Sequence, residues 1–180
     1  MTDKSWSGLR KVLEQDFLCP ALRGRVQYFL THYHGAPDNY GRFCIRVDGQ
    51  EYVMANPYTF WQKGYETLEA EIKRERGVPP REWTAHGMLH EAENEAVEEE
   101  VRRIAQTDGV FDIWDVMRAI ETYRESPISE SLASPVPLIR LLAYLDRRVG
   151  KRTLVQLKKN VSEPDWLCFF LQLRLKAEGL

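Results

Sequence analysis

Residues 25–55 have the sequence "RVQYFLTHYHGAPDNYGRFCIRVDGQEYVMA", and this stretch decides the fold class. Apolar and polar residues alternate along three runs of it, as they do along half-buried β-strands. Asp48 and Gly49 separate the second run from the third, and an aspartate-glycine pair in this position is the strongest short-range signal of a β-hairpin. The first connection, "GAPDNYG", is longer and rich in turn residues. The stretch therefore predicts a three-stranded antiparallel meander.

The residues on both sides of the meander have helical spacing instead. "SWSGLRKVLEQDFL", residues 5–18, predicts an N-terminal helix with a serine cap. After the meander, long helices are predicted over residues 56–77, 88–109, 111–123, 137–150 and 162–180. The piece "LQLRLK" in the last of these alternates, so a strand is the competing interpretation there. Because a small sheet needs helices on one face, the pattern predicts an α+β fold.

The predicted architecture is an N-terminal helix, the meander and a mainly helical C-terminal body. A chain of 180 residues fits one domain, so we expect a single α+β domain over residues 1–180. Residues 1–55 would hold the first helix and the meander, and residues 56–180 the helical part.

Composition narrows the class of protein. The chain is 43% hydrophobic and 29% charged with a net charge of −2, which argues against disorder and against a general attraction to nucleic acid or anionic membranes. Its longest apolar run, "WLCFFL", is too short to span a bilayer. The three cysteines, Cys19, Cys44 and Cys168, form no disulfide or zinc pattern, and each has apolar neighbours. We therefore expect buried thiols, a cytoplasmic location and no contact with membrane.

The stretch "YLDRRVGKRTLVQLKK", residues 144–159, holds six cations and one carboxylate. As a functional feature it would be an anion or nucleic-acid contact through Arg147, Arg148, Lys151 and Arg152. Arg140, Arg147, Arg148 and Lys151 are spaced i, i+7, i+8 and i+11, which complements a leucine stripe and is typical of the solvated side of a helix. Residues 82–125 carry 12 carboxylates against 4 Lys and Arg, so the two regions can also meet within one molecule or across a dimer. We favour the solvated or self-complementary face and keep nucleic acid as the alternative.

The acidic run "EAENEAVEEE" is interpreted in the same way. Catalytic carboxylates need burial or a like-charged partner to shift their pKa, and nothing in this run indicates either. We expect a helix stabilised by pairs at i, i+4, namely Glu98 with Arg102 and Glu99 with Arg103.

Two histidine pairs have spacings that a ligand site can use. His32 and His34 share one face of a strand, and with Arg46 they mark a ligand site on the open face of the sheet. His86 and His90 are spaced i, i+4, but the zinc-protease signature is absent. No phosphate loop, dinucleotide fingerprint or nucleophile elbow occurs either. We therefore predict no metal and no cofactor, and keep a metal-dependent or hydrolytic enzyme as an alternative.

The five tryptophans are spread along the chain, and we expect most of them to anchor helices in the core. Dense aromatic segments such as "YTFW" and "DWLCFF" are where we expect some side chains to reach the surface. A partly exposed aromatic patch indicates an interface more often than a pocket.

Three segments carry a family resemblance: an N-terminal "LCPALRGRV", the "IRVDG" hairpin and "DRRVGKR". Together they resemble a small bacterial family of uncharacterised function, some of whose members are found in mobile gene cassettes. The resemblance implies an α+β fold and carries no catalytic or ligand residue.

The function predicted from the sequence is that of a non-enzymatic interaction protein. It would act as a homodimer or bind another protein. The two alternatives are nucleic-acid binding through residues 140–159 and an enzyme with its site near the meander.

Overall fold

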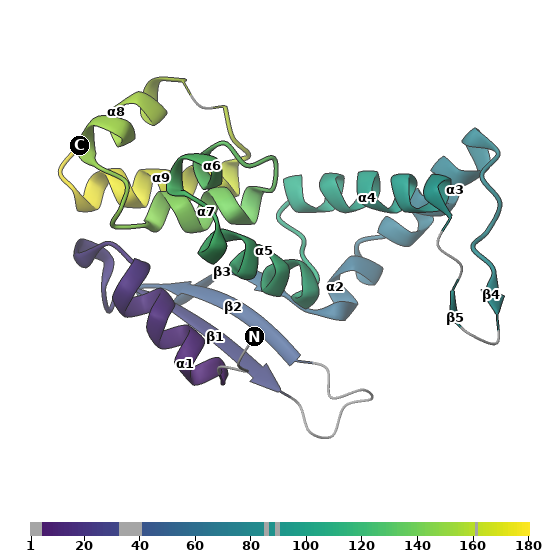
Figure 1. The fold of residues 1–180 in the computed structure, drawn as a ribbon, viewed down its shortest axis with the longest axis horizontal. Coiled ribbons are helices and arrows are strands. Elements are labelled where there is room, and N and C mark those ends of the chain that lie inside the picture. Colours follow the sequence, from purple (N-terminus) through teal and green to yellow (C-terminus); the bar gives the residue numbers. More distant parts are fainter. Residues whose placement is uncertain (1–4, 33–40, 85–86, 89–90, 161) are drawn as a thin grey trace.

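The computed structural model describes residues 5–32, 41–84, 87–88, 91–160 and 162–180. It has the predicted α+β architecture: an N-terminal helix, a three-stranded antiparallel sheet and then helices. Figure 1 shows a body that contains the sheet and both termini, and an arm of helices that projects from it. Predicted ligand residue His34 and the pair His86 and His90 lie outside the described residues.

The predicted meander is confirmed. Strands β1 (Val26–His32), β2 (Gly41–Val47) and β3 (Gln50–Ala55) pair in that order, antiparallel throughout. In the β2–β3 hairpin both Asp48 and Gly49 have positive φ, of 49° and 85°. A two-residue turn of this kind matches the twist of its flanking strands.

The N-terminal helix is confirmed as well. Helix α1 (Trp6–Lys11) begins at Ser5, whose side chain accepts from the backbone N–H of Gly8. It continues as a wider π-helical turn, η1 (Val12–Phe17), and a short 3₁₀ turn, η2 (Pro20–Leu22), follows. This segment lies along β1 and buries its leucines in the main core.

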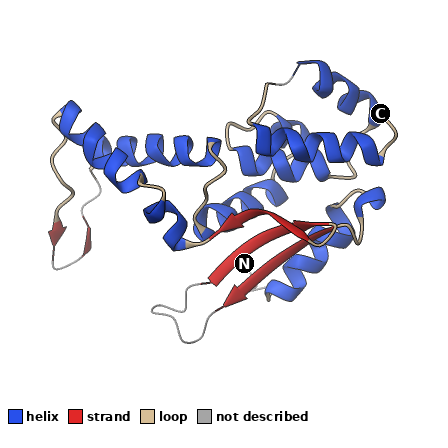
Figure 2. Ribbon diagram, turned by 180° about the vertical axis from the view of Figure 1, so that it is seen from behind, coloured by secondary structure: helices blue, strands red, loops and turns tan. Residues whose placement is uncertain are grey.

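The rest of the body is helical. Its helices are α5 (Ile113–Glu125), α6 (Ile128–Leu132), α7 (Pro137–Leu145), α8 (Lys151–Asn160) and α9 (Asp165–Ala177). Figure 2 shows these helices stacked over one side of the sheet. Helix α5 packs on β2 and on α7, and α7 is buried along its whole length between α5 and α9. The apolar face of the sheet thus forms one core with three helices.

The arm consists of α2 (Pro57–Gln62), α3 (Tyr65–Arg76), the two-residue strands β4 (Trp83–Thr84) and β5 (Gly87–Met88), and α4 (Ala92–Thr107). Helices α3 and α4 pack side by side around a second, smaller apolar cluster, which contains Tyr65, Val97 and Val101. The end of α4 returns the chain to the body, where Phe111 bridges to Ala55 at the end of β3.

Several predicted boundaries were wrong for physical reasons. The helix expected over residues 56–77 breaks at Gly64, whose φ of 78° is left-handed. Between the helices expected over residues 56–77 and 88–109 lies the β4–β5 pair, and because β5 includes Met88, helix α4 begins only at Ala92. Helix α7 ends at Leu145, so residues 146–150 are a turn rather than its last helical turn. The C-terminal segment is helical throughout α9, so the competing strand does not form.

Candidate interaction site

The predicted basic contact contains a structural turn. Asp146 is buried and accepts from the Tyr123 hydroxyl at 2.5 Å and from the backbone N–H and Nε of Arg148, both at 2.7 Å. Burial raises the pKa of Tyr123, which keeps the hydroxyl protonated as a donor. The guanidinium of Arg148 also lies over the rings of Phe17 and Tyr123. Arg148 therefore stabilises the turn between α7 and α8 and its contact with Phe17 of the N-terminal segment.

Of the other three predicted cations, one has a partner within the chain and two are exposed. Lys151 donates to the backbone oxygen of Glu178 at 2.9 Å, and its Nζ lies 3.6 Å from the Glu178 carboxylate. That carboxylate also binds the buried guanidinium of Arg174. Arg147 and Arg152 are exposed, and neither has an ion pair within the described ranges. Two of the four predicted contacts are thus available to an anion.

The predicted ligand site on the sheet stays a prediction. Arg46 is held by Glu51, whose Oε1 lies 2.8 Å from Arg46 Nη2 and 2.9 Å from Arg42 Nη2. These hydrogen bonds, with that from Arg46 first, lower the pKa of Glu51. The backbone of His32 ends β1, but its side chain and all of His34 lie outside the described residues. Among the residues that are described, no three His, Cys, Asp or Glu side chains group as metal ligands would.

The arm pairs its charges between helices α3 and α4. Glu98 lies 2.7 Å from Arg81 Nη2 and 3.4 Å from Lys73 Nζ, and Glu100 binds Arg76 with both oxygens, at 2.7 and 2.9 Å. Two carboxylates of the acidic run, Glu98 and Glu100, are therefore neutralised within the arm.

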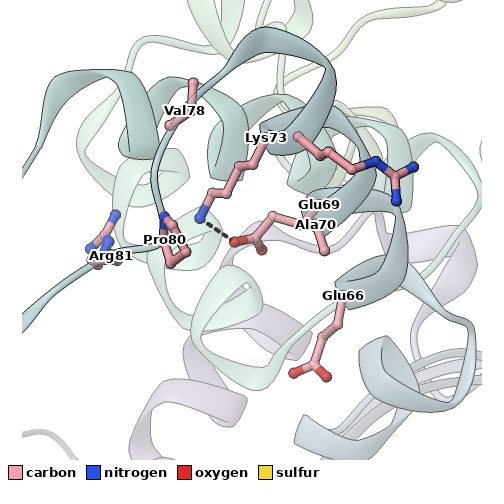
Figure 3. A pocket seen from close by; sticks show the side chains of 8 residues that line it. Glu66, Glu69, Ala70, Lys73, Val78, Pro80 and Arg81 are labelled. Carbon is pink, nitrogen blue, oxygen red and sulfur yellow. Dashed lines mark hydrogen bonds and ion pairs between the residues drawn. The ribbon is translucent and has the colours of Figure 1, made fainter.

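A cavity of about 530 Å³ lies beside α3, under the connector that contains Pro80 (Figure 3). Ala70, Val78 and Pro80 give it an apolar wall. Lys73 extends toward Glu69, and their charged atoms lie 2.6 Å apart. Glu66 and Arg74 also line the cavity and have opposite charges, so the charges of the lining are mixed in sign.

In the C-terminal half of α4, the two ion pairs predicted at i, i+4, Glu98 with Arg102 and Glu99 with Arg103, were wrong. Arg102 pairs with Glu99, at 3.2 Å, and with Asp115 of α5, at 3.3 Å, rather than with Glu98. Glu98 faces α3 and is already paired there. Arg103 is exposed and has no ion pair in the described part of the chain.

A crevice of about 300 Å³ separates this half of α4 from α5 and from residues 134–139. Helix α4 contributes Arg102, Arg103 and Gln106 to its lining, and α5 contributes Asp115 and Arg118. Burial is the largest effect on the Asp115 carboxyl and raises its pKa. The start of α5, which carries Asp115 and Arg118, is fixed by a capping box between Asp112 and Asp115.

Each of the two helices also carries an exposed apolar side chain near an arginine of the crevice. Ile104 is 37% exposed and lines a shallow groove that shares Arg103 with the crevice. Trp114 is 68% exposed and precedes Arg118 by four residues, so the two are neighbours on the surface of α5. We call these four residues, Arg103, Ile104, Trp114 and Arg118, the α4–α5 face.

Sequence reasoning missed the α4–α5 face. The sequence predicts that most of the five tryptophans anchor helices, without singling out Trp114, and it assigns Arg103 to a pair with Glu99. A signal was present, because the buried residues Ile113, Val116 and Ile120 follow helical spacing that leaves Trp114 outside the stripe.

The fold defines the class of the protein: an α+β protein with a meander under a helical body and a projecting helical arm. A protein-family model described as the SF0329 protein family matches residues 5–175. The chain therefore belongs to the SF0329 protein family. Searches of curated proteins and of solved structures gave no match. None of the described helices is long and apolar enough to cross a membrane.

Proposed function

We propose that this chain is a non-enzymatic protein-binding protein that binds its partner through the α4–α5 face. The observation that carries the proposal is Trp114, which is 68% exposed one helical turn before Arg118, and Arg118 lines the crevice together with Arg103. Tryptophan and arginine are enriched among the residues that contribute most of the energy of protein interfaces. Exposing most of a tryptophan side chain on a rigid helix has no benefit for the fold itself.

The partner is either a second copy of this chain or another protein. The protein acts as one folded unit in the bacterial cytoplasm, and two observations support this. Its three cysteines are free thiols, as is usual in a reducing compartment. Among the side chains that the structure describes, the apolar cluster of the arm has five buried residues, Tyr65, Val97, Val101, Ala105 and Val110, so the arm depends on the body.

Comparative co-purification tests the proposal. Tagged wild-type protein and Trp114→Ser are recovered from cells, and the proteins that accompany them are quantified by mass spectrometry. Val155→Ser is the matched control, because Val155 is 36% exposed on α8 at another surface. Light scattering of the purified proteins detects self-association in parallel.

We expect at least one partner, or the dimer, to fall about tenfold or more with Trp114→Ser, which is a typical loss at an interface centre. Val155→Ser should leave it unchanged. Equal recovery with both variants, or no partner and no dimer, would contradict the proposal. Circular dichroism and thermal melting check that both variants are folded.

A second candidate function, nucleic-acid binding, is favoured by the free cations of the basic stretch. Helix α8 carries no carboxylate, and Arg147, Arg152, Lys158 and Lys159 are exposed without ion pairs in the portions of the chain that are described. This surface would give an affinity that falls steeply as salt rises. Fluorescence anisotropy with a labelled oligonucleotide tests it, with Arg152→Gln and Lys159→Gln together as the variant. Binding that ignores both salt and this variant would exclude the α8 surface.

A further inference from the structure

The crevice between α4 and α5 contains an unequal set of charges. Its two carboxylates, Glu99 and Asp115, both pair with Arg102. Arg103 and Arg118 line the same crevice, and neither has an ion pair or a side-chain hydrogen bond among the described residues. Arg102 therefore pairs with both acids while Arg103 and Arg118 make no ion pair, although the charge of Arg118 acts on Asp115 from a distance, against the larger effect of burial.

The nearest other acid does not correct this imbalance. The hydrogen bond from Arg76 is the main cause of the lowered pKa of Glu100, and the charge of Arg103 adds a smaller effect in the same direction. Both Glu100 oxygens, however, are bound by Arg76 of α3. The free guanidinium of Arg103 therefore stays available on the crevice side of α4.

The lining also offers a polar donor and an apolar wall. Gln106 is 6% exposed and lines the crevice, so its side-chain amide can donate to a group bound there. Ala119, Val136 and Ile139 form an apolar wall in the same crevice, suited to the methylene groups of a side chain.

We propose that this crevice is a carboxylate-binding site that takes an acidic side chain of the bound protein between Arg103 and Arg118. This inference rests on the proposed function, because it names what the partner presents to the α4–α5 face. Guanidinium groups match a carboxylate with two parallel hydrogen bonds. The net charge of the crevice is one positive, which balances a carboxylate better than a phosphate, and its apolar wall fits the stem of a glutamate.

Fluorescence anisotropy with a short labelled peptide of alternating glutamate and glycine tests the site. The matching peptide with glutamine in place of glutamate controls for contacts that need no charge. The variant is Arg103→Gln with Arg118→Gln. Its matched control is Arg147→Gln with Arg152→Gln, which removes the same charge from another exposed surface.

We expect the glutamate peptide to bind and the glutamine peptide not to bind. The crevice variant should weaken binding by about tenfold or more, as expected for lost charge-assisted hydrogen bonds. The control variant should change it less than about threefold, through general electrostatics alone. Equal losses in both variants, a loss confined to the control, or no binding by the wild type would overturn the site. Competition by inorganic phosphate but not by glutarate would overturn its preference for carboxylate.

Trp114→Ser and the crevice variant, compared in the co-purification and peptide-binding experiments, separate this inference from the proposed function. If Trp114→Ser releases the partner and the crevice variant does not, the carboxylate site is wrong and the protein-binding face stands. If the crevice variant loses the peptide while Trp114→Ser keeps every partner, the face is wrong and the carboxylate site stands for a ligand other than that partner.

Discussion

Replacing Asp146 with asparagine is expected to destabilise the protein strongly, although Asp146 lies in a segment that the sequence marks as a basic surface. Its carboxylate accepts four hydrogen bonds or ion contacts, one from Tyr123 and three from Arg148, at 2.5 to 2.7 Å. Its side chain is fully buried. Asparagine keeps the shape but loses the charge and turns one acceptor into a donor.

The magnitude follows from these contacts. Breaking a buried ion pair by removing one partner costs about 3–5 kcal/mol. The side chain of Arg148 is 34% exposed, so its guanidinium can regain water, and this lowers the expected cost. We expect Asp146→Asn to reduce the free energy of unfolding by about 2–4 kcal/mol. That is a large fraction of the roughly 5–15 kcal/mol typical of a folded domain.

Urea unfolding followed by tryptophan fluorescence measures this loss, and equal slopes in urea would show that the same surface unfolds. Asp16→Asn is the matched control, because Asp16 is exposed and should change stability by less than about 0.5 kcal/mol. If both substitutions had the same small effect, Asp146 would not stabilise the turn. Arg148 would then be a free cation, and nucleic-acid binding would gain one more contact beside Arg147 and Arg152.

Further outcomes are expected elsewhere in the chain. Gly64→Ala should cost about 1 kcal/mol in urea unfolding, because φ is 78° there, whereas Gly150→Ala, at a negative φ with open space, should cost less than about 0.5 kcal/mol. A thiol reagent should modify the half-buried Cys168 before Cys44, because burial raises the pKa of the Cys44 thiol and excludes the reagent; equal rates in native protein would refute this. Burial also raises the pKa of Asp115 above its value in the unfolded chain. The stability that the buried, protonated carboxyl of Asp115 provides is therefore present in acid and is lost as the pH rises through the folded pKa. Asp115→Asn should remove that loss from a pH series of unfolding curves that begins below about pH 4.

The parts of the fold that depend on local spacing could be predicted from the sequence. The meander follows from a period of two and from the Asp48-Gly49 turn, and both are properties of neighbouring residues. The break at Gly64 was missed because a single glycine is tolerated inside many helices. Only its left-handed φ shows that it separates α2 from α3.

The site depends on contacts between distant residues, and these were harder to predict. The apolar spacing of α7 continues to Val149, yet the helix ends at Leu145, because the Asp146 carboxylate accepts hydrogen bonds from the Tyr123 hydroxyl and from the backbone N–H of Arg148. No local pattern contains that hydrogen bond across 23 residues. In the same way, Arg103 is left free because Glu99 pairs with Arg102 and Glu100 pairs with Arg76 of α3, which only the packing of the helices reveals.

Site-specific photo-crosslinking in living cells tests the proposed binding face most directly. A photoreactive amino acid replaces Trp114 in one strain and Val155, exposed on α8, in another. If the α4–α5 face binds a protein, light should produce a discrete covalent adduct from position 114 and none from position 155. Adducts of equal yield from both positions, or none from position 114, would contradict a binding face between α4 and α5.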